Sequence, residues 1–211
     1  MTPKFSAILL LLLMFSCAAE TAVPGSSQSQ SQTGVCPAPA RPCMYDRDQG
    51  SVPDCMCNVN GVLSILPQHI AHLDFDSHGL AVVYSDGHEG WMYVNRSGTV
   101  LVTNVASMDN GADWFHDGLV RFLRDGKYGF ANRSGNVVIP PTFDGALNFE
   151  RGRAPVCRGC RSERLEGGSI FVDGDWFFIS RKGRILRRTT WRGVLKWYEE
   201  SGKRSHPASS L

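Results

Sequence analysis

The chain has 211 residues, with 22 Lys and Arg against 20 Asp and Glu, so its formal net charge is only +2. Proteins that bind nucleic acid usually carry a clear basic excess, and this small charge therefore argues against nucleic acid as a partner. The charge is unevenly divided, because residues 181–211 hold nine Lys and Arg against two Glu, whereas the remainder holds 13 against 18.

At the start of the chain, residues 1–17 have the features of a signal peptide. Lys4 precedes an unbroken apolar run of nine residues from Ala7 to Phe15. A helix needs about 20 apolar residues to span a bilayer, so this run is too short for a membrane anchor and is typical of a secretory signal. We therefore expect an exported protein of the periplasm or cell envelope, with secretion as the second choice.

Two processing routes remain open at Cys17. The small residues Ser16 and Ala18 suit ordinary signal peptidase, which would remove Cys17 with the leader. Alternatively, the letters Met-Phe-Ser-Cys resemble a bacterial lipobox, and a lipidated Cys17 would then tether the protein to the membrane. The Ser/Gln-rich residues 18–35 have nothing to bury and predict a disordered linker, which a lipid-anchored domain would need as a spacer.

Six cysteines follow the predicted leader, and an even number in an exported protein predicts disulfides. The candidates are Cys36, Cys43, Cys55, Cys57, Cys157 and Cys160. The Cys-x-Cys and Cys-x-x-Cys spacings also fit a tetrahedral zinc set, but an oxidising compartment favours disulfides, whose connectivity the spacing does not determine. Residues 36–57 are rich in Cys and Pro and lack hydrophobic periodicity, so we expect an irregular cap held by disulfides.

A repeat occupies the middle of the chain. The turn glycines Gly61, Gly98 and Gly135 fall 37 residues apart within Asn-x-x-Gly letters, and Gly183 follows 48 residues later. An aromatic strand precedes each of the last three turns, starting at Trp91, Tyr128 and Trp176, and an Asp-Gly pair precedes each strand. A fixed period of this length indicates a repeat architecture.

The letters of one unit predict a three-stranded antiparallel meander. Asp-Gly between two β-rich runs is a strong hairpin signal, and Asn-x-x-Gly allows a second chain reversal. A meander buries one face only by stacking on its neighbours, so each copy supplies the core that the next copy lacks. We therefore predict an all-β fold of tandem meander repeats stacked into one domain.

These units resemble the WG repeat of bacterial proteins. The family pattern reads Gly-Leu-Ala-x-Val, then Asp-Gly-Lys-Trp-Gly-Phe-Ile-Asp, then Gly-x-x-Val-Ile-x-Pro-x-Phe-Asp. Residues 118–149 follow it closely with Tyr128 in place of Trp, whereas the unit of Trp91 has two extra residues and the unit of Trp176 has Phe177 in place of Gly. The resemblance covers residues 58–186 and implies an interaction or envelope role, with no catalytic residues to transfer.

The motifs of common enzymes are missing from the sequence. It has no Gly-x-Ser-x-Gly elbow, no His-Glu-x-x-His and no phosphate-binding loop with Lys. The polar group His69, His72, Asp74, Asp76 and His78 has the letters of a metal site, but its place between repeat strands favours solvent-facing polar residues. The repeat aromatics Trp91, Tyr128 and Trp176 would suit a stacking platform, although equivalent repeat positions more often form core.

After the repeats, residues 187–211 form a basic tail that we expect to be partly helical. Trp191, Val194, Leu195 and Tyr198 fall on one helical face. A helix that caps the last repeat is the favoured interpretation, and contact with anionic lipid or polymer is the alternative.

The sequence therefore predicts a non-enzymatic module, without cofactor or metal, that binds an unknown envelope protein or glycan. One alternative is a thiol–disulfide oxidoreductase that uses Cys157 and Cys160, with Arg158, Arg161 and Arg164 lowering the thiol pKa. Another is a purely structural envelope component.

Overall fold

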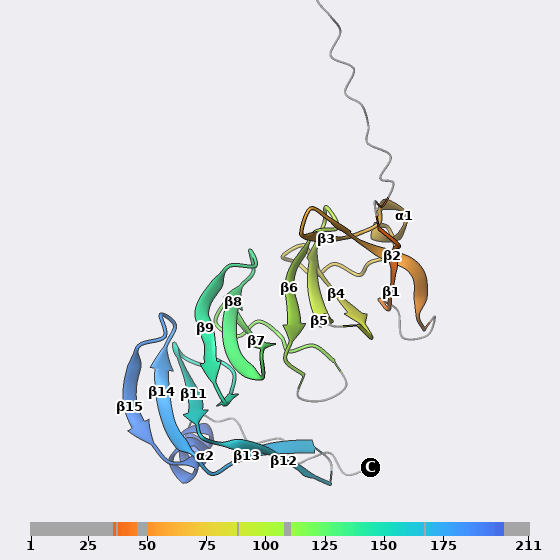
Figure 1. Cartoon of the computed structure of the whole chain (residues 1–211). Coiled ribbons are helices and arrows are strands. Elements are labelled where there is room, and N and C mark those ends of the chain that lie inside the picture. Colours follow the sequence, from red (N-terminus) through yellow and green to blue (C-terminus); the bar gives the residue numbers. More distant parts are fainter. Residues whose placement is uncertain are drawn as a thin grey trace, which may run out of the picture. The chain divides into compact units, whose positions relative to one another are not determined.

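The computed structural model describes residue 36 and residues 38–45, 50–87, 89–107, 111–166 and 168–200, which belong to the compact unit Gly34–Leu211. The predicted signal peptide with Cys17, the whole predicted linker and residues 201–211 lie outside the described residues. The strands (Figure 1) are β1 (Arg41–Cys43), β2 (Val52–Val59), β3 (Val62–Ile65), β4 (Leu80–Ser85), β5 (Gly90–Asn95), β6 (Val100–Val105), β7 (Leu119–Arg124), β8 (Lys127–Asn132), β9 (Val137–Phe143), β10 (Gly145–Ala146), β11 (Arg153–Arg158), β12 (Arg161–Leu165), β13 (Gly168–Val172), β14 (Asp175–Ser180) and β15 (Ile185–Thr189). The helices are α1 (Pro67–Ile70) and α2 (Trp191–Glu200).

The strands form antiparallel meanders, as the repeat predicted. The second unit is β4-β5-β6 and the third is β7-β8-β9, and a single residue pair, Val105 with Phe122, joins them into a six-stranded sheet. The fourth unit is β11-β14-β15, with the short β10 added beside β11. The all-β fold class is therefore confirmed.

Positive φ angles mark the predicted turns. In the third unit Asp125 and Gly126 have φ of 51° and 72°, which suits a two-residue hairpin turn. The turn glycine Gly135 has φ of 81°, a value that residues with a Cβ rarely adopt. In the second unit the corresponding hairpin turn is longer, and the positive φ falls on Gly90 rather than on Asp86 and Gly87.

The first unit is more regular than the sequence indicated. Residues 36–57 were expected to be irregular, yet they contain β1 and most of β2, and β1-β2-β3 form a complete three-stranded sheet. The disulfide between Cys43 and Cys55 links β1 to β2, and that between Cys36 and Cys57 ties the preceding residues to β2. Cysteine and proline interrupt the alternation of polar and apolar residues that would identify a strand.

The central strands β5, β8 and β14 each contribute to two cores. In β5, Met92 and Val94 pack with Cys55 and Met56 of the first unit, whereas Tyr93 packs with residues of the third unit. Consecutive side chains of a strand point to opposite faces, so the second and third units each lie between two neighbours. Burying one large apolar side chain stabilises the fold by about 1.5–3 kcal/mol, and a unit without a neighbour would lose one of its two cores.

The helix α2 covers the outer face of the last unit, as predicted for a cap. Val194 and Trp197 are buried against Trp176 and Phe178 of β14, and the rings of Trp197 and Phe178 lie 5.1 Å apart. The predicted helical face was partly wrong, because Leu195 is exposed and Trp197 takes the buried position. Within the described part of the chain, no helix combines the length and apolar character that a membrane span requires.

The extra residues that lengthen the last period from 37 to 48 form a hairpin. Strands β12 and β13 pair over five residue pairs, from Arg161 with Val172 to Leu165 with Gly168. They lie between β11 and β14, at the position where the third unit has its two-residue turn.

Candidate binding site

An open cavity of about 430 Å³ lies against the second unit, beside β4 and β5. Its apolar and aromatic wall includes Tyr45, Leu80, Val82, Trp91, Tyr93 and Trp114. Asp74 and Asp76 also line it, and among the described lining residues none is Lys or Arg. A concave, mainly apolar surface with a few polar groups is the usual form of a ligand site.

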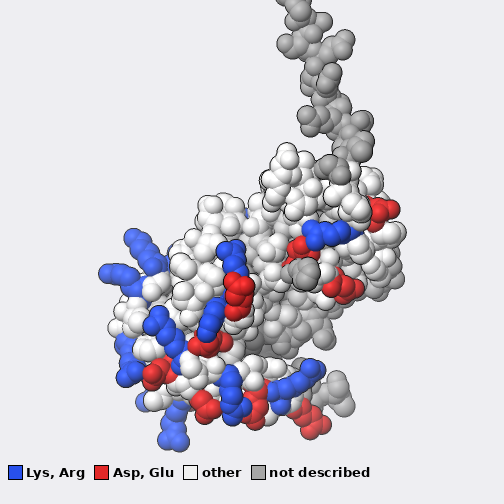
Figure 2. Space-filling view, viewed as in Figure 1, with Lys and Arg blue, Asp and Glu red and all other residues white. Residues whose placement is uncertain are grey.

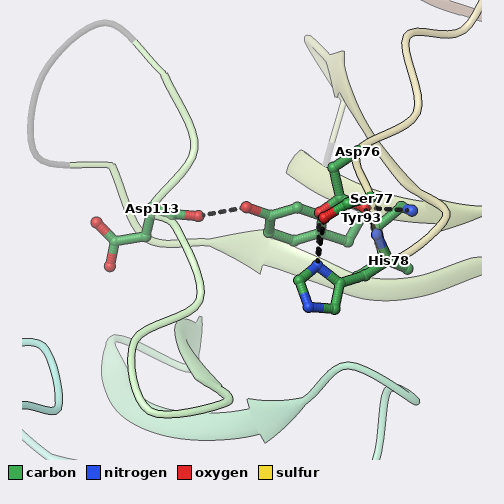
Figure 3. Close-up of polar contacts among 6 residues, drawn as sticks. Asp76, Ser77, His78, Tyr93 and Asp113 are labelled. Carbon is green, nitrogen blue, oxygen red and sulfur yellow. Dashed lines mark hydrogen bonds and ion pairs between the residues drawn. The ribbon is translucent and has the colours of Figure 1, made fainter.

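Tyr93 of β5 lies at the centre of this region (Figure 3). Its side chain is 7% exposed, and its hydroxyl donates a 2.7 Å hydrogen bond to the backbone carbonyl of Asp113. The ring of Phe115 packs on it at 4.7 Å between centroids. Burial, with the nearby Asp113 and Asp76 carboxylates, raises the pKa of Tyr93 to about 12, so the hydroxyl stays protonated and remains a donor.

A buried ion pair fixes the loop that carries Asp113. Arg121 of β7 is 1% exposed, and its Nε and Nη2 donate to the Asp113 carboxylate at 2.5 and 2.8 Å. Arg121 also donates from Nη1 to the carbonyl of Ala146, and the Asp113 amide donates to the carbonyl of Ala106 at 2.7 Å. Removing one partner of such a pair costs about 3–5 kcal/mol, so Asp113 is firmly held in its place.

This anchoring leaves Trp114 at the surface. The side chain of Asp113 before it and that of Phe115 after it are both engaged with the protein, whereas Trp114 is 79% exposed at the rim of the cavity. A large aromatic side chain on a rigid loop loses little conformational entropy when a partner covers it. Trp114 therefore has the properties of a binding contact.

Asp76 holds the opposite rim of the cavity. Its Oδ1 accepts hydrogen bonds from the amides of His78 and Leu80 at 2.8 and 2.9 Å. Desolvation opposes ionisation, but these two hydrogen bonds, together with charge interactions with His78 and Arg133, outweigh it and hold the pKa of Asp76 below its usual value. The carboxylate is thus ionised at neutral pH and gives this rim a negative charge.

The polar group considered as a metal site is not gathered at one point. His69 contacts the Tyr45 hydroxyl through Nδ1 at 3.3 Å and the Asp54 carbonyl through Nε2 at 3.2 Å. The ring of His72 stacks on Tyr45, while Asp76 and His78 belong to the turn before β4. Among the described residues no set of three His, Cys, Asp or Glu side chains is arranged to hold a metal ion.

Comparison with protein families decides what the repeats are. The model of the WG containing repeat matches residues 128–159, which run from β8 into the residues that follow β11. The chain therefore contains a WG repeat. No curated protein and no solved structure gave a significant match to the chain.

The glycine of the WG motif has a steric role in this WG-repeat protein. A Cβ on Gly129 would lie 2.8 Å from the carbonyl oxygen of Ile139 and 2.9 Å from the ring of Phe122, so no larger residue fits there. The second and fourth units carry Met92 and Phe177 at this position of the strand. The match to the family model accordingly falls on the unit that keeps the glycine.

The three repeat aromatics of the WG-repeat protein do not form one platform. Trp91 lines the cavity and packs on Tyr84 at 4.9 Å between ring centroids. Tyr128 and Trp176 both contact Phe171 in the core of the last unit, and Trp176 is buried. Of the three, Trp91 alone lines the cavity described above.

The Cys-x-x-Cys pair of the WG-repeat protein is a disulfide between Cys157 and Cys160. Cys157 lies in β11 and both cysteines are buried against α2 and β14. Neither lies at the start of a helix, where a backbone dipole would stabilise a thiolate. The remaining repeat glycines, Gly61 and Gly183, lie in turns at the two ends of the array.

Sequence reasoning missed Trp114 and the pair formed by Asp113 and Arg121. These residues lie outside the repeated turns, and nothing in the spacing of Asp113 and Arg121 shows that the fold buries them together. One feature of the sequence could have indicated Trp114: it is a tryptophan in the loop that connects two units, and binding residues are often found on such loops.

Proposed function

We propose that this WG-repeat protein is a non-enzymatic, exported binding module of the cell envelope, and that Trp114 and the adjoining cavity contact its protein or glycan partner. The observation that supports this proposal is the exposure of Trp114, 79%, on a loop held by the buried pair of Asp113 and Arg121. Tryptophan is among the residues most enriched at binding hot spots.

The charge of the cavity narrows the chemistry of the partner. The lining residues that the structure describes include two carboxylates, Asp74 and Asp76, and no cationic side chain. Such a surface disfavours anionic polymers and suits a neutral glycan, whose apolar ring faces stack on Trp, or an uncharged or basic peptide. Cation–π contact with Trp91 and Trp114 would add to the binding of a basic peptide.

Binding to envelope material tests the proposal directly. Immobilised wild-type protein should retain a soluble envelope protein or a neutral envelope polysaccharide in a saturable way, and the Trp114→Ala variant should bind at least about 30-fold more weakly, as hot-spot residues do. Leu165→Ala is a matched control, because Leu165 is an exposed apolar residue on β12, away from the cavity. Equal binding by wild type and Trp114→Ala would contradict the proposal.

A thiol–disulfide oxidoreductase receives no support from the site. Cys157 and Cys160 are buried and joined, and a buried sulfur is poorly placed to exchange with a substrate. The Cys157→Ser/Cys160→Ser variant should keep partner binding and lose modest stability. Reduction of insulin by the wild type in the presence of dithiothreitol, abolished in this variant, would instead favour the redox function.

The envelope location rests on the leader and on Cys17. If Cys17 is lipidated, the Cys17→Ser variant moves from the membrane fraction to the soluble fraction. Mass spectrometry of the mature N-terminus provides the second measurement: an unmodified chain that begins at Ala19 would show that the protein is not a lipoprotein.

A further inference from the structure

The turn of one unit rests on the third strand of the unit before it at all three internal junctions. A Cβ on Gly98 would lie 2.9 Å from the carbonyl of Ile65 in β3, and one on Gly135 would lie 2.6 Å from the carbonyl of Leu101 in β6. A Cβ on Gly183 would contact the side chain of Ile139 in β9 at 3.5 Å. The turn glycine of each later unit therefore lies against the third strand of the unit before it, closely at Gly98 and Gly135 and in ordinary contact at Gly183.

The first junction also contains backbone pairing. The amide of Ile65 donates a 2.7 Å hydrogen bond to the carbonyl of Gly98, and Ser64 forms an antiparallel bridge with Thr99. The turn and the start of the following strand thus extend the edge of the preceding sheet. An edge strand offers unpaired amides and carbonyls for such an addition.

The first unit leaves its own turn uncovered. Gly61 is the equivalent of Gly98 and Gly135, and no described atom lies within 4 Å of the position that its Cβ would occupy. Val59 and Val62, on either side of this turn, are 43% and 51% exposed. We refer to residues 58–62 as the leading turn.

The last unit leaves its third strand, β15, uncovered. Strand β15 is the end strand of its sheet, with β14 as its neighbour among the described strands. Ile185 and Leu186 are 52% and 50% exposed, and Leu186 follows Gly183 by three residues as Leu101 follows Gly98. Helix α2 packs on Trp176 and Phe178 of β14 and leaves both β15 side chains exposed.

The two ends carry opposite charge. Residues 50–87 contain four Asp and no Lys or Arg, whereas residues 181–200 contain seven Lys and Arg and two Glu. On the face shown in Figure 2, Lys and Arg are numerous over the C-terminal strands and few over the first strands. Complementary charge steers association and fixes its orientation.

We propose that a second copy of this chain docks head to tail, with the leading turn of one copy against β15 of the other. The contact repeats the arrangement that the chain uses at its internal junctions. Because the two surfaces differ, the interface is heterologous, and each bound copy exposes another β15 for the next one. This interface is separate from the Trp114 cavity and does not depend on its function.

Sedimentation velocity of the purified mature chain tests the proposal over about 1 μM to 1 mM, a range that corresponds to weak and moderate interfaces. Wild type should form oligomers as the concentration rises, and added salt should weaken them at least about tenfold because the ends attract by charge. Leu186→Glu on β15 and Val62→Arg in the leading turn should each stay monomeric, while Leu165→Glu on β12 should associate like wild type.

Mixing the two variants distinguishes a head-to-tail contact from a symmetric one. The Leu186→Glu chain keeps its leading turn and the Val62→Arg chain keeps its β15, so their mixture should form dimers and no larger species. Thermal melting followed by circular dichroism checks that each variant is folded. If one variant does not fold, the other still tests its own end of the interface, β15 or the leading turn. Wild type that stays monomeric throughout, or variants that associate like wild type, would overturn the proposal.

Discussion

The turns of Gly98 and Gly135, in the middle of the array, can be compared with those of Gly61 and Gly183, at its two ends. All four have Asn-x-x-Gly letters or their equivalent, but their surroundings differ. Gly98 and Gly135 lie against the backbone of the preceding unit, whereas Gly61 faces open space and Gly183 makes an ordinary contact with a side chain. All four have positive φ, so backbone conformation requires glycine equally at each. In the middle of the array, close packing of the units therefore adds a second requirement for glycine, namely the absence of a Cβ.

The largest effect is expected for Gly135→Ala. Its Cβ would lie 2.6 Å from the carbonyl oxygen of Leu101, an atom of the backbone that cannot move aside cheaply, and its φ is 81°. Overpacking and left-handed strain together should lower the free energy of unfolding by about 3–5 kcal/mol. Urea denaturation measures this change, and a loss below that of Gly61→Ala would refute the proposed junction.

Gly98→Ala should have an intermediate effect. Its Cβ would meet the end of the Ile70 side chain at 2.7 Å, which can rotate, as well as the Ile65 carbonyl at 2.9 Å. We expect the free energy of unfolding to fall by about 2–4 kcal/mol, less than for Gly135→Ala, because the Ile70 side chain can move and relieve part of the crowding. Shortening Ile70 in the double variant Gly98→Ala/Ile70→Val should recover part of the loss; an additive loss would argue against this contact.

The terminal turns should show the smallest effect. In Gly61→Ala and Gly183→Ala the new Cβ would have no described atom closer than 3.5 Å. Left-handed strain is then the whole cost, and the free energy of unfolding should fall by about 1–2 kcal/mol. Asparagine tolerates this conformation, and Gly61→Asn should therefore melt close to wild type. A loss at Gly61→Asn comparable to that of Gly135→Ala would show that the leading turn is packed, contrary to the comparison.

The sequence was sufficient for the repeat because the turns depend on local chemistry. Asp125-Gly126 and the Asn-x-x-Gly letters before Gly135 favour positive φ through local chemistry, and the strands between them are rich in apolar and aromatic residues. Strands β1 and β2 were missed because their cysteines are held by long-range disulfides rather than by a local pattern. Periodicity alone also placed Leu195 rather than Trp197 on the buried side of α2.

The candidate site was less predictable than the fold. Trp91 was recognised from its place in the repeat, but Trp114 becomes notable only when Asp113 and Arg121 are seen to be buried together. Arg121 falls in the strand letters "LVRFLR", where a charged residue usually points to solvent. Its burial depends on the carboxylate of Asp113 and the carbonyl of Ala146, which only the folded chain brings to it.

The β12–β13 hairpin shows where this fold tolerates longer chains. Strands β11 and β14 pair up to Arg158 with Asp175, as β7 and β8 pair up to Arg124 with Lys127, although the connection between them is far longer. The added residues pair with one another, so the register of the host strands is unchanged. A foreign peptide grafted between Leu165 and Gly168 would therefore be displayed without disturbing the repeat, which makes this hairpin a natural acceptor for engineered epitopes.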